Sequence, residues 1–95
     1  MKQYTYTDGV RFLAQNADCY WLLTHIFLHQ SVEKIKKEEF QTWKIIVHAN
    51  NAATITVDEG NGNVIETFEI PFTDFPLSEY ELWFIDGVLI LKSEY

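Results

Sequence analysis

The sequence is poor in residues that cross-link a chain or anchor it in a membrane. Cys19 is the single cysteine among 95 residues, so no disulfide can form within the chain. The longest uninterrupted apolar run, Cys19–Leu23, has five residues, whereas a membrane-spanning helix needs about 20. No charged segment followed by an apolar one opens the chain, as it would in a secretory signal peptide. These absences favour a protein of the reducing cytoplasm that does not contact membranes.

Basic residues are also scarce, and they are unevenly distributed. Seven Lys and Arg face 14 Asp and Glu, for a net charge of −7. Residues 1–57 hold five acids and six bases, whereas residues 58–95 hold nine acids and one base, Lys92. Nucleic-acid affinity comes chiefly from Lys and Arg on phosphates, so we expect no direct binding to DNA or RNA. The acid excess indicates either a solubility device or a face for a basic protein partner.

Apolar content is high despite this charge. Hydrophobic residues make up 47% of the chain and aromatic residues 16%, which is too apolar for a disordered segment. A chain of this length buries roughly 60–68% of its unfolded surface and can hold a core without metals or disulfides. We expect one globular domain over residues 1–95.

The first third of the chain has helical periodicity. Thr7 or Asp8 is placed to cap a helix, and an apolar stripe follows at helical spacing. Asp18 is placed to cap a second, strongly apolar helix over residues 19–30. The charge-mixed residues 31–39 are either a helical extension or an exposed connector. The apolar stripe of the first helix consists of Val10, Leu13, Ala14 and Ala17.

The remainder of the chain alternates apolar and polar residues with the period of β-strands. Two prolines make residues 71–78 an irregular crossing segment, from which Phe72 and Phe75 are expected to pack on the core. Asp86-Gly87 is a two-residue hairpin turn. Strands are predicted at 41–48, 53–58, 63–70, 81–85 and 88–91. The predicted fold is α+β, with two N-terminal helices packed on one face of an antiparallel sheet of about five strands that ends in a β-hairpin.

Several fragments in a fixed order resemble one family. They are YTDGV at 6–10, YWLL at 20–23, EFQTW at 39–43, DFPL at 74–77, DGVL at 86–89 and the final SEY. In this order and spacing the chain is similar to a family of small bacterial proteins described as a domain of unknown function. The resemblance spans nearly the whole chain and implies no activity, cofactor or catalytic residue.

His25 and His29 are the candidate metal ligands. They are four residues apart on the second predicted helix, a spacing at which two imidazoles can reach one metal. They also share a helical stripe with Asp18, which is typical of the polar edge of a core helix. The second interpretation predicts no metal and no cofactor. Further ligands would have to come from Asp18, Cys19 or His48.

No motif indicates catalysis. Cys19 opens a strongly apolar helix, and a free cysteine in such a place is typically a packed thiol rather than a nucleophile. The chain has no nucleophile elbow and no phosphate-binding glycine loop. An enzymatic activity is therefore not expected.

We interpret the chain as a non-enzymatic, acidic protein-interaction module that uses residues 58–95 to bind a basic protein partner. Exposed aromatic residues next to carboxylates are also expected to support a homodimer. A special case is a phage or mobile-element protein whose carboxylates imitate the phosphates of DNA. The residues assigned to the interaction are Glu66, Glu69, Glu79, Glu81, Trp83 and Tyr95.

The alternative is a small ligand-binding protein or enzyme with a pocket between the helices and the sheet. A deep pocket reached by two or more histidines would favour this alternative, whereas a filled core with exposed aromatic residues would favour the interaction module. The residues that would line the pocket are Tyr20, Trp21, His25, His29 and His48.

Overall fold

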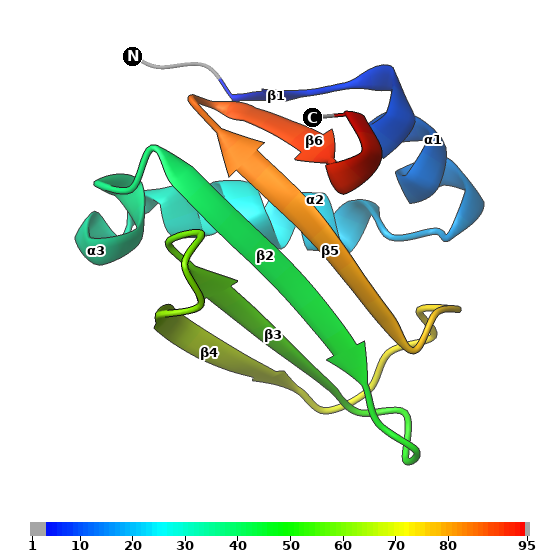
Figure 1. The fold of residues 1–95 in the computed structure, drawn as a ribbon. Helices are drawn as coiled ribbons and strands as arrows, with labels where there is room; N and C mark the ends of the chain where they lie inside the picture. The colour runs from blue at the N-terminus through cyan, green and yellow to red at the C-terminus, as the bar shows by residue number, and fades with distance from the viewer. Residues whose placement is uncertain (1–3, 95) are drawn as a thin grey trace.

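Six strands form one sheet in the order β1-β6-β5-β2-β3-β4 in the computed structural model, which describes residues 4–94 (Figure 1). The short β1 is parallel to β6, and every other neighbouring pair is antiparallel. The strands are β1 (Thr5–Tyr6), β2 (Phe40–Val47), β3 (Ala53–Asp58), β4 (Val64–Ile70), β5 (Glu79–Ile85) and β6 (Val88–Leu91).

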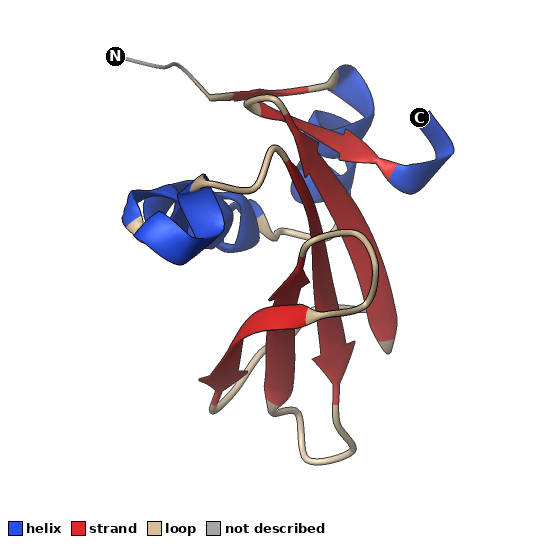
Figure 2. Ribbon diagram, turned by 60° about the vertical axis from the view of Figure 1, so that its left-hand side comes forward, coloured by secondary structure: helices blue, strands red, loops and turns tan. Residues whose placement is uncertain are grey.

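The helices lie against one face of this sheet. In Figure 1 α2 runs behind the strands, α1 lies beside β6, and α3 lies beside the β3–β4 end; Figure 2 shows α2 and α3 on one side of the sheet. The helices are α1 (Asp8–Asn16), α2 (Tyr20–Leu28) and α3 (Glu33–Lys36), with 3-10 turns η1 (His29–Ser31) and η2 (Lys92–Glu94).

Alternate residues of the central strands form the core together with α2. Trp43 and Ile45 of β2 and Ile55 of β3 are at most 2% exposed, and they pack with Leu22 and Ile26 of α2. This period of two confirms the strand pattern read from the sequence and leaves the opposite face of the sheet to Lys44, Thr54 and other polar side chains.

A buried amide pair connects the end of the helical layer to the sheet. Gln30 and Gln41 are 3% and 1% exposed, and their side-chain amides exchange two hydrogen bonds of 2.8 and 2.9 Å. Gln41 also accepts from the Trp43 indole at 2.9 Å and donates to the carbonyls of Ile35 and Glu38. Every one of these groups is satisfied, which is what burial of an amide requires.

The α+β prediction is confirmed, but two of its details are wrong. The sheet has six strands and is mixed, because Thr5–Tyr6 adds a parallel strand beside β6. Residues 4–94 contain three α-helices rather than two, since Glu33–Lys36 forms α3 within the segment 31–39, for which either a helical extension or a connector was expected. The final hairpin is confirmed, with positive φ at both Asp86 and Gly87, as a type I′ turn requires.

Of the two predicted helix caps, one is confirmed and one is wrong. Thr7 caps α1 as expected, because its hydroxyl accepts a hydrogen bond from the Val10 amide. Asp18 does not cap α2: the N-cap residue is Cys19, without a side-chain cap, and Asp18 has a φ of 51°. The tight turn between the two helices thus uses the left-handed conformation that aspartate tolerates.

Among residues 4–94 no helix is both long and apolar enough to cross a membrane.

Candidate functional site

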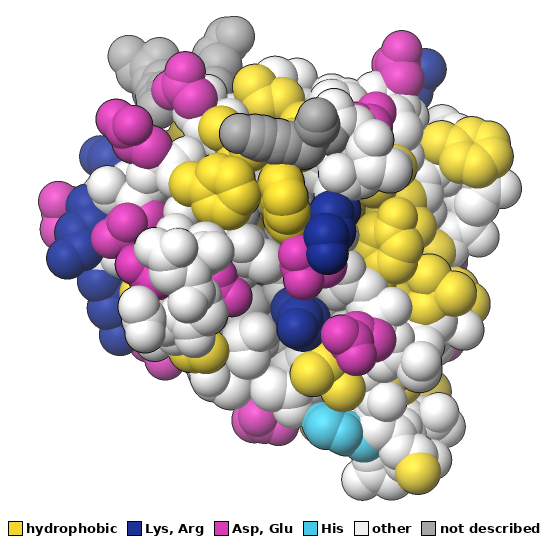
Figure 3. Space-filling view, in the orientation of Figure 1, with side chains coloured by type: hydrophobic (Ala, Val, Ile, Leu, Met, Phe, Trp, Pro, Cys, Tyr) yellow, Lys and Arg dark blue, Asp and Glu magenta, His cyan; other side chains and the backbone are white. Residues whose placement is uncertain are grey.

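The sheet face turned away from α2, here called the open face, carries most of the predicted interaction residues. Strand alternation and register put Lys44, Glu69, Glu79, Glu81 and Trp83 on it. Figure 3 shows this face, with basic and acidic side chains interspersed near its centre and hydrophobic side chains above and to the right of them.

The carboxylates of the open face have partners within the chain. Glu79 lies 3.7 Å from the Lys44 ammonium, and Glu81 accepts a 2.7 Å hydrogen bond from the Trp83 indole. Glu69 accepts from the hydroxyl of Thr54. The Lys44 ammonium therefore balances part of the negative charge of this face, and the Trp83 indole and the Thr54 hydroxyl donate hydrogen bonds to Glu81 and Glu69.

Glu66 lies apart from the other predicted interaction residues. It shares the helix side of β4 with Phe68, and its carboxylate is 2.7 Å from the ammonium of Lys34 on α3. Hydrogen bonds from Lys34 and from the backbone of Thr67, together with the positive charge of Lys34, lower the pKa of Glu66. Tyr95, also assigned to the interaction, lies outside the described residues.

The two candidate metal-ligating histidines do meet. The ring centroids of His25 and His29 are 4.2 Å apart, and both rings contact Phe68. His29 Nδ1 hydrogen-bonds the backbone carbonyl of His25 at 2.7 Å. His48 lies elsewhere, bonded to Thr54. Within residues 4–94 no group of three or more His, Cys, Asp or Glu could hold a metal ion.

His25 is held as a neutral ring. Its Nε2 atom is buried and has no hydrogen-bond partner among the described residues, and the ring meets Trp43 and Phe68 edge to face. Desolvation, followed by the nearby His29, lowers the pKa of His25 to about 4. This is the behaviour of a packing histidine at the edge of the core.

Cys19 is a packed thiol, as the apolar helix suggested. It is fully buried, and burial, aided by the charge of Asp18, raises the pKa of the thiol to about 11. A thiol with this pKa is almost entirely protonated at neutral pH, and it is therefore a poor nucleophile.

An exposed apolar groove is lined by residues of α1 and of the 71–78 segment. Figure 3 shows hydrophobic side chains at its right-hand side, where α1 lies. The groove measures about 340 Å³. It is bordered by two exposed hydrophobic side chains, Phe12 on α1 and Leu77 in the 71–78 segment, with exposed fractions of 68% and 43%. We call it the α1 groove; it is lined by Gly9, Phe12, Leu13, Asn16, Ala17, Pro76, Leu77, Tyr80 and Leu91.

A wider, more polar cleft adjoins the α1 groove through Tyr80. It measures about 590 Å³ and is lined by Glu79, Tyr80, Glu81, Lys92 and Ser93. Tyr80 lines both hollows, and its ring packs on Phe75 beneath them. The two hollows together form one extended surface that is apolar at the α1 end and charged at the sheet end.

Sequence patterns did not single out the α1 groove. One signal was present, because Phe12 lies on the helix side opposite the apolar stripe of Val10, Leu13, Ala14 and Ala17. A large aromatic residue on the polar side of an amphipathic helix has no core to pack into. That Leu77 would lie across from it depends on a long-range contact that no local pattern shows.

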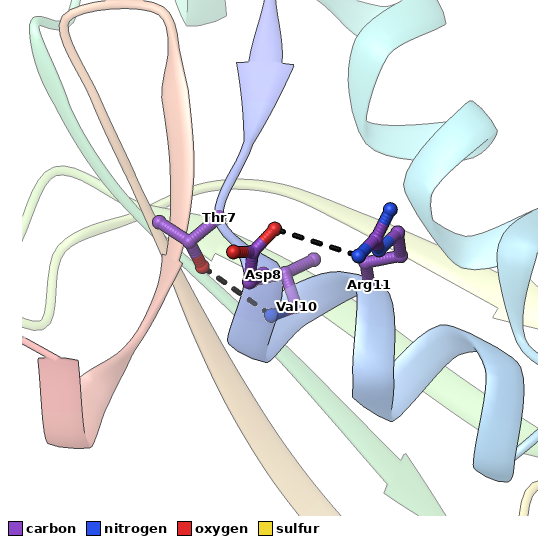
Figure 4. Close-up of polar contacts among 4 residues, drawn as sticks. All are labelled: Thr7, Asp8, Val10 and Arg11. Atoms are coloured by element: carbon purple, nitrogen blue, oxygen red, sulfur yellow. Dashed lines mark hydrogen bonds and ion pairs between the residues drawn. The ribbon is translucent and has the colours of Figure 1, made fainter.

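The start of α1 is held by the C-terminal residues. Thr7 caps the helix and Asp8 pairs with Arg11 at 3.7 Å (Figure 4). The Glu94 carboxylate then accepts a 2.6 Å bond from the Thr7 hydroxyl and a 2.9 Å bond from the Leu91 amide. These bonds, with a further one from the Gly9 amide, lower the pKa of Glu94. A carboxylate at a helix N-terminus also complements the helix dipole.

Gly9 and Glu94 are expected to be energetically coupled. A Cβ at position 9 would lie 2.6 Å from the Glu94 carboxylate, so Gly9→Ala should displace Glu94 and remove its bonds. In a Glu94→Ala background the same change should instead stabilise α1, because alanine favours helix by up to about 1 kcal/mol over glycine. A double-mutant cycle by urea unfolding should give a coupling of about 1 kcal/mol. Additive effects would contradict this contact.

The fold and the site define a small α+β protein with helices on one face of a mixed sheet and an exposed apolar groove at one edge. The chain belongs to the family described as "Family of unknown function (DUF6876)", whose pattern matches residues 1–95. The expected membership of a family of unknown function is thereby confirmed. Neither the curated proteins nor the solved structures include a significant match.

Proposed function

We propose that this protein is a non-enzymatic interaction module that binds a segment of a partner protein in the α1 groove. The segment has an apolar anchor that fills the space between Phe12 and Leu77, and a basic residue that reaches Glu79 and Glu81 in the adjoining cleft. The observation that carries the proposal is the exposure of two large apolar side chains across one groove.

Exposure of these side chains is costly unless something covers them. Phe12 and Leu77 both line a groove whose surface is mostly apolar, and contiguous exposed apolar surface is typical of protein-binding sites. Other large exposed hydrophobics such as Leu28, at 67%, do not line any of the hollows described above. The α1 groove therefore has the apolar centre that interfaces use for their anchor residues.

Charge supports a basic segment as the occupant. The chain carries a net charge of −7, and two carboxylates, Glu79 and Glu81, line the cleft that continues the groove. A cation on the partner would compete with Lys44 for Glu79, whose pair at 3.7 Å is solvent-exposed and weak. Charge complementarity of this kind speeds association and makes it sensitive to salt.

The filled interior favours an interaction module over the alternative of an internal ligand pocket. Leu22 and Ile26 of α2 close directly on Trp43 and Ile55, and the gap among them has no room for a water molecule. His48 hydrogen-bonds Thr54 on the open face and does not line this gap. The α1 groove and the cleft that adjoins it, at about 340 and 590 Å³, are both open surface features.

Affinity capture with matched variants tests this proposal. Purified tagged protein should capture a partner from an extract of the source cells at low salt and release it at high salt. The double variant Phe12→Ser/Leu77→Ser should weaken binding at least about tenfold, because it removes both anchors of the groove. Leu28→Ser is the control, since it removes an equally exposed apolar side chain on another surface.

Three results would contradict the proposal. Equal loss of binding in the control would show that general surface hydrophobicity causes the capture. Full binding by the double variant would remove the groove from the interface. Concentration-dependent self-association by light scattering, abolished in the double variant, would make a second copy the occupant instead of a basic partner.

A further inference from the structure

The segment that follows β4 presents two side chains outward in a fixed arrangement. Thr73 and Phe75 are 6% and 5% exposed and face inward. The Thr73 amide donates to the Asn51 carbonyl at 2.8 Å, and its hydroxyl accepts from the Phe75 amide at 3.1 Å. Phe72 and Asp74, the alternate residues, therefore project to solvent. The expectation that Phe72 packs on the core is wrong, because its side chain is 68% exposed.

Phe72 and Asp74 line a hollow of about 240 Å³ together with Trp21 of α2, Ile70 and Thr73. An indole, a phenyl ring and a carboxylate thus line one small surface hollow. Aromatic faces attract cations through their quadrupole, and a carboxylate adds a full negative charge. We call this site the Trp21 hollow.

Asp74 differs from the other acids of residues 58–95 that are described above. Glu66, Glu69, Glu79 and Glu81 each have a side-chain partner, and Glu94 is held by Thr7. The Asp74 carboxylate, in contrast, makes no hydrogen bond or ion pair with any residue between 4 and 94. Its charge is thus available to a ligand in the Trp21 hollow.

We infer that the Trp21 hollow binds a cationic side chain, the guanidinium of arginine or the ammonium of lysine, on the partner protein. The cation lies against the Trp21 and Phe72 rings and pairs with Asp74. This inference rests on the proposed function and specifies the partner further, because it requires a second basic contact near Phe72 and Asp74, whereas the α1 groove is lined by Pro76 and Leu77 of the same segment.

Small probes test the site without a partner. N-acetyl-arginine methyl ester and choline chloride should shift the Trp21 indole resonance of ¹⁵N-labelled protein saturably, with millimolar affinity, and shift the Trp83 indole less. The neutral choline isostere 3,3-dimethylbutan-1-ol should bind at least about threefold more weakly, since cation–π attraction is lost. Equal binding of the isostere would overturn the cationic assignment.

Two variants locate the probe. Asp74→Asn should weaken the binding of both cations about threefold or more, and Phe72→Ala should do the same without unfolding the protein, because Phe72 is exposed. Glu33→Gln removes a charge from the exposed surface of α3 and should leave binding unchanged. Unchanged binding in Asp74→Asn would refute the site.

If probe binding fails while the double variant of the α1 groove still loses its partner, the cation site in the Trp21 hollow is refuted and the proposed interaction module is not.

Discussion

Replacing Gln41 with leucine should lower the free energy of unfolding by about 3 kcal/mol. Gln41 is 1% exposed, and its amide joins the Gln30 amide, the Trp43 indole and two backbone carbonyls. Each buried group left without a partner costs about 1–3 kcal/mol, and leucine can satisfy none of them. Urea unfolding followed by circular dichroism measures the loss.

A second variant separates hydrogen bonding from packing. Adding Gln30→Leu to Gln41→Leu removes the partner amide as well, so the double variant should recover part of the lost stability. Gln15→Leu is the control, because Gln15 is exposed on α1 and the change should stay within about 0.5 kcal/mol. If Gln41→Leu is as mild as Gln15→Leu, the amide cluster does not connect the helical layer to the sheet as described.

Acidification should destabilise the protein through His25. Its pKa is about 4 in the folded chain and about 6.5 in the unfolded chain, so the unfolded state takes up a proton first. The free energy of unfolding should therefore fall as the pH drops from about 6.5 to about 4, and His25 should contribute no further loss below that range. Because the ring is not completely buried, we expect the free energy of unfolding to fall by about 2 kcal/mol, which is less than the whole pKa difference between the two states would give.

The variant His25→Phe isolates this contribution. Phenylalanine keeps the edge-to-face contacts with Trp43 and Phe68 and has no proton to gain. Stability between pH 6.5 and 4 should then fall less steeply than in the unmodified chain, in which carboxylate protonation also contributes. Identical slopes for the unmodified chain and His25→Phe would contradict a neutral, partly buried His25.

Local signals in the sequence predicted the local parts of the fold. Thr7 or Asp8 was the expected cap because both residue types are preferred at a helix N-terminus, and in the structure the Thr7 hydroxyl accepts from the Val10 amide. Asp86-Gly87 predicted the final hairpin because both residues accept positive φ. β1 was missed because two residues have no measurable periodicity, and its pairing with β6 spans more than 80 residues. The prediction that Asp18 caps the second helix was wrong because aspartate is favoured both at helix N-caps and in tight turns, and here it lies in the turn.

The candidate site was less predictable than the fold, since exposure is a tertiary property. The acidic residues of 58–95 could be counted from the sequence, but Lys34 and Lys44, which balance Glu66 and Glu79, come from other elements. Phe72 and Phe75 have the same chemistry in the sequence, yet one is exposed and the other buried. The difference arises from the hydrogen bonds that hold Thr73 inward between them.

Binding in the α1 groove is tested by the dissociation constant of a captured partner, measured by calorimetry for the unmodified chain and for Phe12→Ser/Leu77→Ser at low and high salt. We expect the unmodified chain to bind more weakly at high salt and the double variant to bind at least about tenfold more weakly at low salt. Binding that is indifferent both to salt and to the loss of these two side chains would contradict this proposal.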